Sequence, residues 1–285
     1  MLNIKSNARK GGKGFKGVLF FLIGTILAII YIFPIYILAS SSFKTQKGLF
    51  ENPLNLPNKL NFTLNNYENA FSKLNYFHSF LNSLYITIIS VILIVLISAM
   101  AAWALARHKT KISKIIFLTF AISMLIPFQC TMLPLLKVAK YVNLLNPQGL
   151  IFMYVGYGVS LSVVIIHGFI KNIPEEIEEA AIVDGCNVFQ LFFIIVLPLL
   201  KIILITVAII NIIWIWNDFL LPSLIINNKP QWRTLPLMTF SFFGAYSRRW
   251  DLATAALFMC ILPVILFYMW SQKYIISGIT DGSIK

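Results

Sequence analysis

Six stretches of apolar residues, each long enough to cross a lipid bilayer as a helix, dominate this sequence. A hydrocarbon core about 30 Å thick needs roughly 20 helical residues, and a spanning backbone must form helices or a closed barrel because lipid offers it no hydrogen bonds. The runs are continuously apolar and lack the alternation of barrel strands. We therefore expect an all-α membrane protein with six transmembrane helices, at about 18–39, 80–106, 115–136, 149–170, 202–221 and 252–269.

The composition excludes the main alternatives to a membrane protein. Apolar residues make up 59% of the chain and charged residues only 12%, whereas soluble domains carry about 25% charged residues and disordered chains are low in apolar residues. In so apolar a chain, the net charge of +13 is better explained by orientation in a bilayer than by nucleic acid. The spacing of the three cysteines offers neither a disulfide framework nor paired metal ligands, so no metal site is expected.

Two basic clusters set the expected orientation. One precedes the first apolar run and the other, from Arg107 to Lys114, separates the second and third runs. Basic residues beside span ends favour the cytoplasm, so both termini are predicted to be cytoplasmic, with a basic tail at 1–17, a six-helix membrane domain at 18–276 and a C-terminal tail at 277–285. The first run is too long for a signal-peptide core of about 7 to 15 residues, so it is predicted to be an uncleaved span.

The third run contains two prolines. Pro127 lies within it and Pro134 lies near its end, and each removes a backbone donor and crowds a preceding carbonyl. The sequence therefore predicts a kinked or broken helix. Such irregularity is tolerated in membranes where protein or a water-filled cavity covers the freed carbonyls, so Pro127 marks either part of a transport pathway or a packing kink.

Half of the acidic residues fall in one cytoplasmic interval, 171–200, between the fourth and fifth runs. Asn172 is a predicted helix cap, Pro174 fits the first turn, and Gly185 is expected to end the helix. Asn187 and Gln190 have capping-box spacing for a second helix. We expect two short cytoplasmic helices, which either lie solvated on the membrane or form a docking site for another protein.

The interval resembles the EAA motif of binding-protein-dependent ABC importer permeases. The matching residues run from Pro174 to Gly185, followed after nine residues by Ile195-Val196-Leu197-Pro198. Further likeness to carbohydrate-type permeases, above all the smaller permease of maltose-type importers, extends over nearly the whole chain. It rests on Asn82-Ser83-Leu84, Arg107, Met124-Leu125-Ile126-Pro127, Trp216-Asn217-Asp218-Phe219, Leu221-Pro222, Arg233-Thr234-Leu235-Pro236 and the tail from Gly278 to Lys285.

The resemblance implies a non-catalytic subunit with the type I importer permease fold, in a bacterial cytoplasmic membrane. The expected partners are a second permease, two ATPase subunits that bind ATP and magnesium, and an extracytoplasmic sugar-binding protein; this chain itself is expected to hold no cofactor. The interval 171–200 would provide the coupling helix seated in one ATPase. Its implied docking residues are Pro174, Glu175, Glu178, Glu179, Ala180, Ala181, Asp184, Gly185, Leu197 and Pro198.

Residues elsewhere have candidate roles in handling sugar. An acid in the membrane is costly and suggests function, so Asp218 is a candidate pathway residue with Pro127, Trp216 and Asn217, although it could instead anchor or gate the span end. In the last outer loop, Asn228, Trp232 and Arg233 are candidate contacts for the binding protein; the alternative is an interfacial aromatic belt.

Three alternative functions remain open. One is a membrane scaffold without a transport role, although it leaves the predicted docking helix unexplained. An ABC permease for a solute other than sugar shares the EAA motif. A secondary transporter would need an inverted internal repeat and an intramembrane charge relay, and neither is visible in the sequence.

Overall fold

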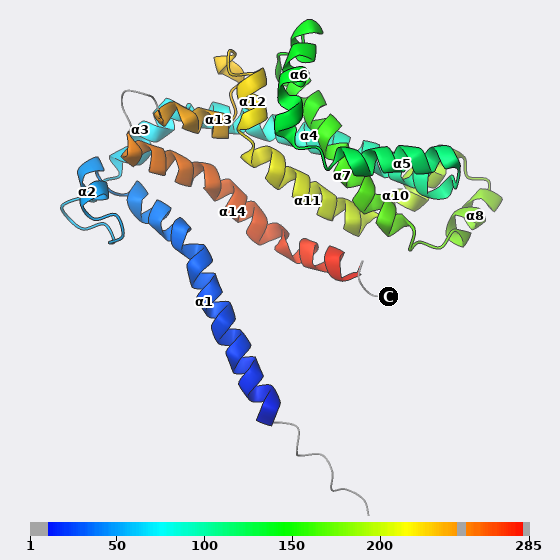
Figure 1. Ribbon diagram of the computed structural model, residues 1–285, viewed down its shortest axis with the longest axis horizontal. Helices are drawn as coiled ribbons and strands as arrows, with labels where there is room; N and C mark the ends of the chain where they lie inside the picture. Colours follow the sequence, from blue (N-terminus) through cyan, green and yellow to red (C-terminus); the bar gives the residue numbers. More distant parts are fainter. Residues whose placement is uncertain (1–10, 244–248, 282–285) are drawn as a thin grey trace, which may run out of the picture. The chain divides into compact units, whose positions relative to one another are not determined.

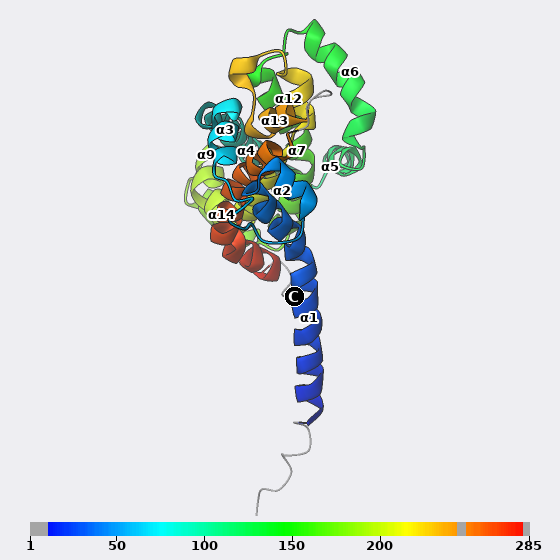
Figure 2. The same ribbon diagram turned by 90° about the vertical axis from the view of Figure 1, so that its left-hand side faces the viewer.

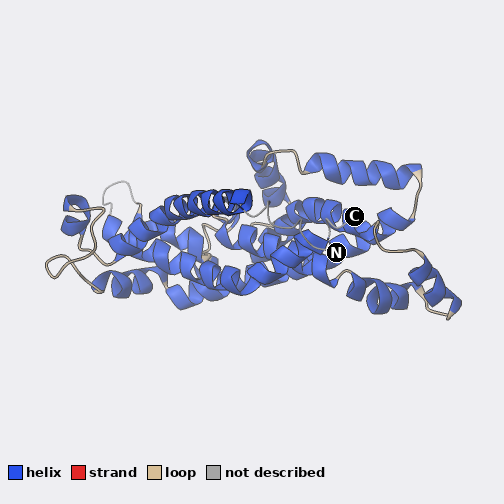
Figure 3. Cartoon of the chain, turned by 90° about the horizontal axis from the view of Figure 1, so that it is seen from below, coloured by secondary structure: helices blue, strands red, loops and turns tan. Residues whose placement is uncertain are grey.

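The computed structural model describes residues 11–243 and 249–281, so residues 1–10 of the predicted basic tail and residues 282–285 of the predicted C-terminal tail lie outside it. Within the described residues the named elements are helices, and an isolated β-bridge joins Lys44 to Phe62 (Figure 1, Figure 3). The first helices are α1 (Gly11–Ser42), α2 (Gln46–Glu51), α3 (Asn65–Leu74), α4 (Tyr76–Arg107), α5 (Lys111–Ser123), α6 (Phe128–Tyr141) and α7 (Pro147–Ile170). They are followed by α8 (Glu176–Val183), α9 (Val188–Gln190), the π-helix η1 (Leu191–Val196), α10 (Leu197–Leu199), α11 (Lys201–Asn217), α12 (Leu220–Ile225), the 3₁₀-helix η2 (Pro230–Trp232), α13 (Leu235–Thr239), the 3₁₀-helix η3 (Phe240–Phe242) and α14 (Trp250–Asp281).

The predicted all-α class is confirmed, and the apolar runs appear as helices. Four helical segments are long and apolar enough to cross a membrane unbroken: Gly17–Ser42, Tyr76–Arg107, Pro147–Ile170 and Trp250–Gln272. Two further candidates are bent pairs, α5 with α6 at 104° and the segment Val188–Leu199 with α11 at 76°. Counting each pair as one span gives up to six.

The third run is broken as its prolines predicted, although only one proline breaks it. Pro127 is extended, with φ −61° and ψ 138°, and α6 starts at the next residue. A proline disfavours helix for the residue before it and cannot donate a backbone hydrogen bond, which accounts for the end of α5 at Ser123. Pro134 lies inside α6 without interrupting it. The run 115–136 is therefore divided between α5 and α6, and Figure 2 shows α6 leaving the line of α5.

The chain divides into two compact units, the first formed by residues up to Ser72 with Phe242–Met259. In this unit a fully buried lysine organises the segment between α1 and α3. The Lys44 ammonium donates to the carbonyl oxygens of Asn52 at 2.9 Å and Pro53 at 3.1 Å, and desolvation lowers the pKa of Lys44. The Asn66 amide donates to the carbonyl of Lys44 at 2.7 Å. Side chains thus hold this segment in place by donating hydrogen bonds to its backbone carbonyls.

The second unit, Lys73–Ser241 with the chain from Cys260 onward, has α4 packed on α7 and α11 at its centre (Figure 1). Small residues let these backbones approach closely, as in other membrane helix pairs. A Cβ atom on Gly158 of α7 would lie 2.5 Å from Ile94 Cδ1 of α4 and 2.9 Å from Asn211 Oδ1 of α11. The buried cluster includes Ala99, Ala102, Ala106, Val159, Val163, Ile166, Ile170, Ile203 and Val207.

Two glycines of α7 provide a matched test of how closely the start of this helix packs against Leu144, in the segment that precedes it. A methyl group on Gly149 would overlap the backbone carbonyl of Leu144, whereas one on Gly156 would meet open space. We predict that Gly149→Ala lowers the free energy of unfolding by about 1–3 kcal/mol through overpacking. Gly156→Ala should be neutral or stabilising by up to about 1 kcal/mol, because alanine favours helix. Unfolding in detergent, followed by tryptophan fluorescence, measures both, and equal effects would contradict the packing.

Candidate functional site

The acidic interval forms a short helix, α8, that starts later than the sequence suggested. The predicted cap at Asn172 is wrong: the residue before α8 is Glu175, whose side chain makes no capping bond. The backbone N–H groups of Asn172 and Ile173 instead donate to Phe169 and Ile170, so these residues continue the end of α7. The competing hydrogen bonds of α7 therefore displace the start of α8.

The end of α8 forms as predicted. Gly185 has φ +89°, a left-handed conformation that glycine adopts without a Cβ penalty. Its N–H donates to the carbonyl of Ile182, and the N–H of Cys186 donates to that of Ala181, which together form a Schellman motif.

The second helix also starts where its capping box predicted. Gln190 N–H donates to Asn187 Oδ1 and Asn187 N–H to Gln190 Oε1, both at 2.9 Å. The π-helix that follows was not predicted. Its wider turn precedes Pro198, whose ring would crowd the carbonyl four residues earlier in an α-helix. Leu197 is half-buried and Pro198 is exposed.

The two faces of α8 have different surroundings. Glu178 and Ala181 are buried, whereas Ile177, Glu179, Ala180 and Val183 are exposed, as is Asp184 after the helix. Ala180 and Ala181, which are adjacent in the sequence, therefore lie on different sides of α8, Ala180 outside and Ala181 inside. α8 lies at one end of the helices of its unit (Figure 1).

Glu178 is held by α4. The Arg107 guanidinium donates to Glu178 Oε1 from Nη2 at 2.7 Å and from Nε at 2.9 Å, and the Trp103 indole donates to Oε2 at 2.9 Å. A buried carboxylate is stable only with such partners. In the sequence, Arg107 bore on the orientation of the chain and on its family likeness, and its pairing with Glu178 was not predicted. The sequence does contain one signal for such a pair: two glutamates precede the alanine pair, and an arginine ends an earlier span.

Glu175 makes a second link that is open to solvent. The Lys109 ammonium lies 2.8 Å from Glu175 Oε1, and Arg107 lies 3.8 Å from it. The hydrogen bond and charge of Lys109 lower the pKa of the exposed Glu175 carboxyl, and the charge of Arg107 adds to this effect. Surface pairs of this kind contribute little to stability.

At the opposite end of α4, two polar side chains hold the loop that contains η2. The Asn82 amide donates to the carbonyls of Gln231 at 2.9 Å and Arg233 at 3.2 Å. Ser83 Oγ accepts from the N–H of Leu235 at 2.8 Å. On this loop, Asn228 is exposed, whereas Trp232 and Arg233 are half-buried. The candidate contact residues thus lie on an ordered loop.

The candidate pathway residues do not converge on one cavity. Asp218 accepts from the Tyr154 hydroxyl at 2.9 Å and from the N–H of Leu220 at 2.9 Å, so both its carboxylate oxygens are bound within the chain. Asn217 is exposed, and its amide donates to the carbonyl of Ile213. Trp216 is buried and lines a cavity of 380 Å³ with Phe80, Leu84, Thr87, Ile88, Ile212, Ile213, Pro263, Val264 and Phe267.

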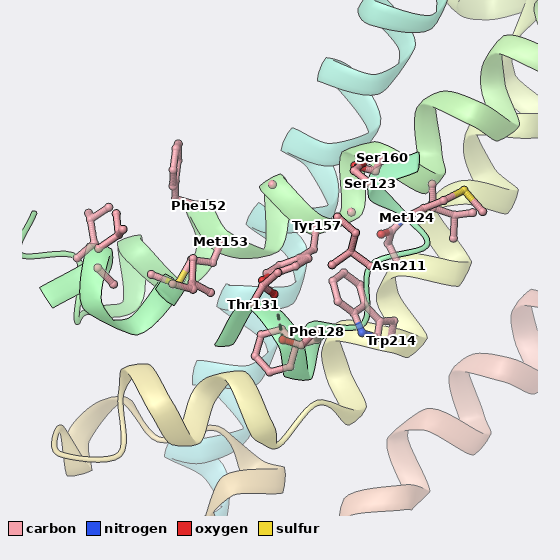
Figure 4. A pocket seen from close by; sticks show the side chains of 18 of the residues that line it. Ser123, Met124, Phe128, Thr131, Phe152, Met153, Tyr157, Ser160, Asn211 and Trp214 are labelled. Carbon is pink, nitrogen blue, oxygen red and sulfur yellow. Dashed lines mark hydrogen bonds between the residues drawn. The ribbon is translucent and has the colours of Figure 1, made fainter. Parts of the chain in front are cut away.

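A larger cavity, of 670 Å³, lies between α5, α6, α7 and α11 (Figure 4). Its walls are mainly apolar, and Trp214 of α11 contributes an aromatic face. Polar groups are paired across it: the Thr131 and Tyr157 hydroxyls lie 2.7 Å apart, and Ser123 Oγ donates to Ser160 Oγ at 2.8 Å. The break at Pro127 places its neighbours Ile126 and Phe128 in the wall.

Ser83 provides a test of the loop anchor. We predict that Ser83→Ala, which removes the acceptor for the Leu235 N–H, raises the hydrogen-exchange rate of that amide by about fivefold, because a bond of roughly 1 kcal/mol is lost. Ser223→Ala is the matched control, since its hydroxyl only donates to the carbonyl of Leu220. Exchange at Leu235 that is unchanged in Ser83→Ala would contradict the anchor.

Comparisons with known proteins agree with this geometry. The family model for the inner membrane component of binding-protein-dependent transport systems matches residues 94–281. The chain is 45% identical over 263 residues to the probable starch degradation products transport system permease protein of Thermoanaerobacterium thermosulfurigenes, covering 92% of this chain and 95% of that protein. It is 33% identical over 266 residues to the melibiose/raffinose/stachyose import permease protein of Bacillus subtilis strain 168, covering 93% and 95%.

A solved structure shows the same fold. It is a chain from the crystal structure of a bacterial ABC transporter involved in the import of the acidic polysaccharide alginate. The TM-score is 0.78 with 20% sequence identity, covering 96% of this chain and 99% of that one. With the matching family model and relatives, these findings show that the chain belongs to the binding-protein-dependent transport system inner membrane component family, whose members are multi-pass, non-catalytic permease subunits.

Proposed function

We propose that this protein is the smaller permease subunit of an ATP-driven importer for a sugar or oligosaccharide. Its family supplies the transport role, and the names of the two relatives supply the substrate class. In this proposal an extracytoplasmic binding protein delivers the sugar, and a second permease completes the pathway. Both termini of this chain face the cytoplasm of the bacterium.

The observation that carries the proposal is the two-sided helix α8. Its inner side is bound by α4, and its outer side presents Ile177, Glu179, Ala180 and Val183. The small Ala180 allows close approach of a partner, and Glu179 offers acceptors to its donors. We infer that this outer side, with Pro174, Glu175, Asp184 and Gly185 at its ends, docks in an ATPase subunit that binds ATP and magnesium.

Glu178, Ala181, Leu197 and Pro198 have a different part in this proposal. Glu178 and Ala181 face inward, and Leu197 and Pro198 lie where the chain turns toward α11. They are therefore proposed to join α8 to the membrane helices, while the exposed outer side of α8 makes the contacts with the ATPase. ATP-driven closure of the ATPases would move α8 and shift the spans between two access states.

The sugar would meet this subunit at the larger cavity. An aromatic face at Trp214 suits the apolar face of a sugar ring, and the hydroxyl groups of the cavity suit its polar edge. Pro127 shapes this cavity through the break between α5 and α6. Trp216, Asn217 and Asp218 are proposed to support the pathway from the neighbouring end of α11, and Asn228, Trp232 and Arg233 to contact the binding protein.

Affinity purification of the tagged chain from its native membrane tests the proposed function. We expect mass spectrometry to identify a second permease, an ATPase and a sugar-binding protein. The retained binding protein is then tested for binding to malto-oligosaccharides and raffinose. A chain recovered alone under conditions that preserve a known importer would contradict the importer, and a binding protein specific for a non-sugar solute would contradict the substrate class.

Charge reversal on the outer side of α8 tests the docking surface. We predict that Glu179→Lys weakens retention of the ATPase about tenfold, or ~1.4 kcal/mol, because it replaces an acceptor with a repelling charge. Glu51→Lys, at an exposed pair with Lys47 in α2, is the control. ATPase retained at the wild-type ratio and with wild-type salt resistance by Glu179→Lys would refute docking through this residue.

The turn at Gly185 gives a second test. Valine is strained at φ +89°, so we expect Gly185→Val to distort the end of α8 at a cost of about 1–2 kcal/mol and to separate ATP hydrolysis from uptake. Gly185→Asn should keep most of the uptake, since asparagine tolerates this conformation. Uptake per ATP hydrolysed, measured in vesicles, compares the two; normal coupling in the valine variant would count against the assignment.

A further inference from the structure

Each oxygen of the buried Glu178 carboxylate is bound from a single turn of α4. Arg107 donates twice to Oε1, at 2.7 and 2.9 Å, and Trp103 donates to Oε2 at 2.9 Å. The Glu178 side chain is 8% exposed and that of Arg107 is 15% exposed. Such charge-assisted bonds, shielded from water, fix the position of α8 relative to α4.

The same turn of α4 also contacts the chain on both sides of α8. Arg107 Nη2 donates to the carbonyl of Ile173 at 3.2 Å, before the helix. The Trp103 ring lies 5.4 Å from that of Phe192, after the helix. α4 therefore holds the segment before α8, α8 itself and the segment after it.

The exposed pair between Lys109 and Glu175 cannot fix the position of α8 relative to α4 in the same way. Its side chains are 73% and 46% exposed, so water competes for the interaction and salt screens it. The buried contact at Glu178 is the stronger mechanical link.

Behind this contact, α4 is joined to the centre of the unit. Ala99, Ala102 and Ala106 of α4 are buried in one cluster with Val163 and Ile166 of α7. Close-packed interiors transmit displacement because they have few voids to absorb it. A pull on Arg107 is therefore passed to α4 and α7 together.

We propose that Arg107 and Glu178 are positioning residues that transmit the movement of α8 to α4, so that ATP hydrolysis in a docked ATPase drives transport. This inference rests on the proposed function and adds a route by which force leaves α8. The force reaches α4 through a side-chain contact, in addition to the backbone that connects α8 to α7 and to α11. Because Glu178 faces away from the outer side of α8, weakening the contact leaves the docking surface in place.

The first experiment separates docking from transmission. The complete transporter is reconstituted in vesicles with its binding protein, and ATP hydrolysis and uptake of tritiated maltotriose or raffinose are measured together. Glu178→Gln keeps the shape of the side chain but replaces one acceptor with a donor. We expect its ATP hydrolysis to stay within about twofold of wild type, with normal ATPase retention, while uptake per ATP falls about tenfold. Glu51→Gln makes the same chemical change at an exposed pair and should behave as wild type.

A double cysteine variant with a reversible cross-link provides a second test. The same preparation is measured with the link formed and with the link released, so that it serves as its own control. Arg107→Cys and Glu178→Cys are combined in a chain whose Cys130, Cys186 and Cys260 are replaced by serine. A short bis-methanethiosulfonate reagent joins the two thiols, and dithiothreitol releases them. We expect uptake per ATP to be about fivefold higher in the joined form than in the released form.

The outcomes separate the two proposals. Wild-type coupling in Glu178→Gln, or equal coupling in the joined and released forms, would overturn the transmission role. A wild-type complex that hydrolyses ATP but takes up neither sugar, although its binding protein binds one of them, would overturn the proposed function instead, and the transmission role with it.

Discussion

The close packing of α4 against α7 is the constraint on which the rest of the second unit depends. In a bilayer, helix association gains little from the hydrophobic effect, and backbones must approach closely to gain contact energy. Alanine and serine along α4 and Gly158 on α7 make that approach possible. Every other contact described at the two ends of α4 relies on the position this packing gives it.

From that position α4 holds one candidate functional segment at each end. Asn82 and Ser83 bind the loop of η2, and Trp103 and Arg107 bind α8. The helix between Asn82 and Arg107 is about 37 Å long at 1.5 Å per residue, which exceeds the roughly 30 Å of a hydrocarbon core. Both sets of polar contacts can therefore lie outside the hydrocarbon while one rigid helix connects them.

Local chemistry explains which features the sequence could predict. The break at Pro127, the left-handed turn at Gly185 and the capping box at Asn187 depend on neighbouring residues only, and all three form as predicted. The cap at Asn172 failed because the end of α7 competes for the same backbone. That competition depends on how far α7 extends, which residue types near Asn172 do not reveal.

The site was predicted less completely than the fold because its decisive contacts join distant residues. Arg107 and Glu178 are 71 positions apart, and no local pattern distinguishes the inward Glu178 from the outward Glu179. Asp218 stood out as an acid near a span end, yet Tyr154 and a backbone N–H bind both its oxygens. Only the packing of the helices shows which charged groups remain available to partners.

The proposed function requires above all that the outer side of α8 meets an ATPase in the cytoplasm. Photocross-linking with p-benzoylphenylalanine tests this contact, with the probe placed either at Val183 of α8, which is 87% exposed, or at Tyr141 at the end of α6, which is 89% exposed. We expect a cross-link to the ATPase from position 183 and none from position 141. No cross-link from position 183, or one from position 141, would contradict it.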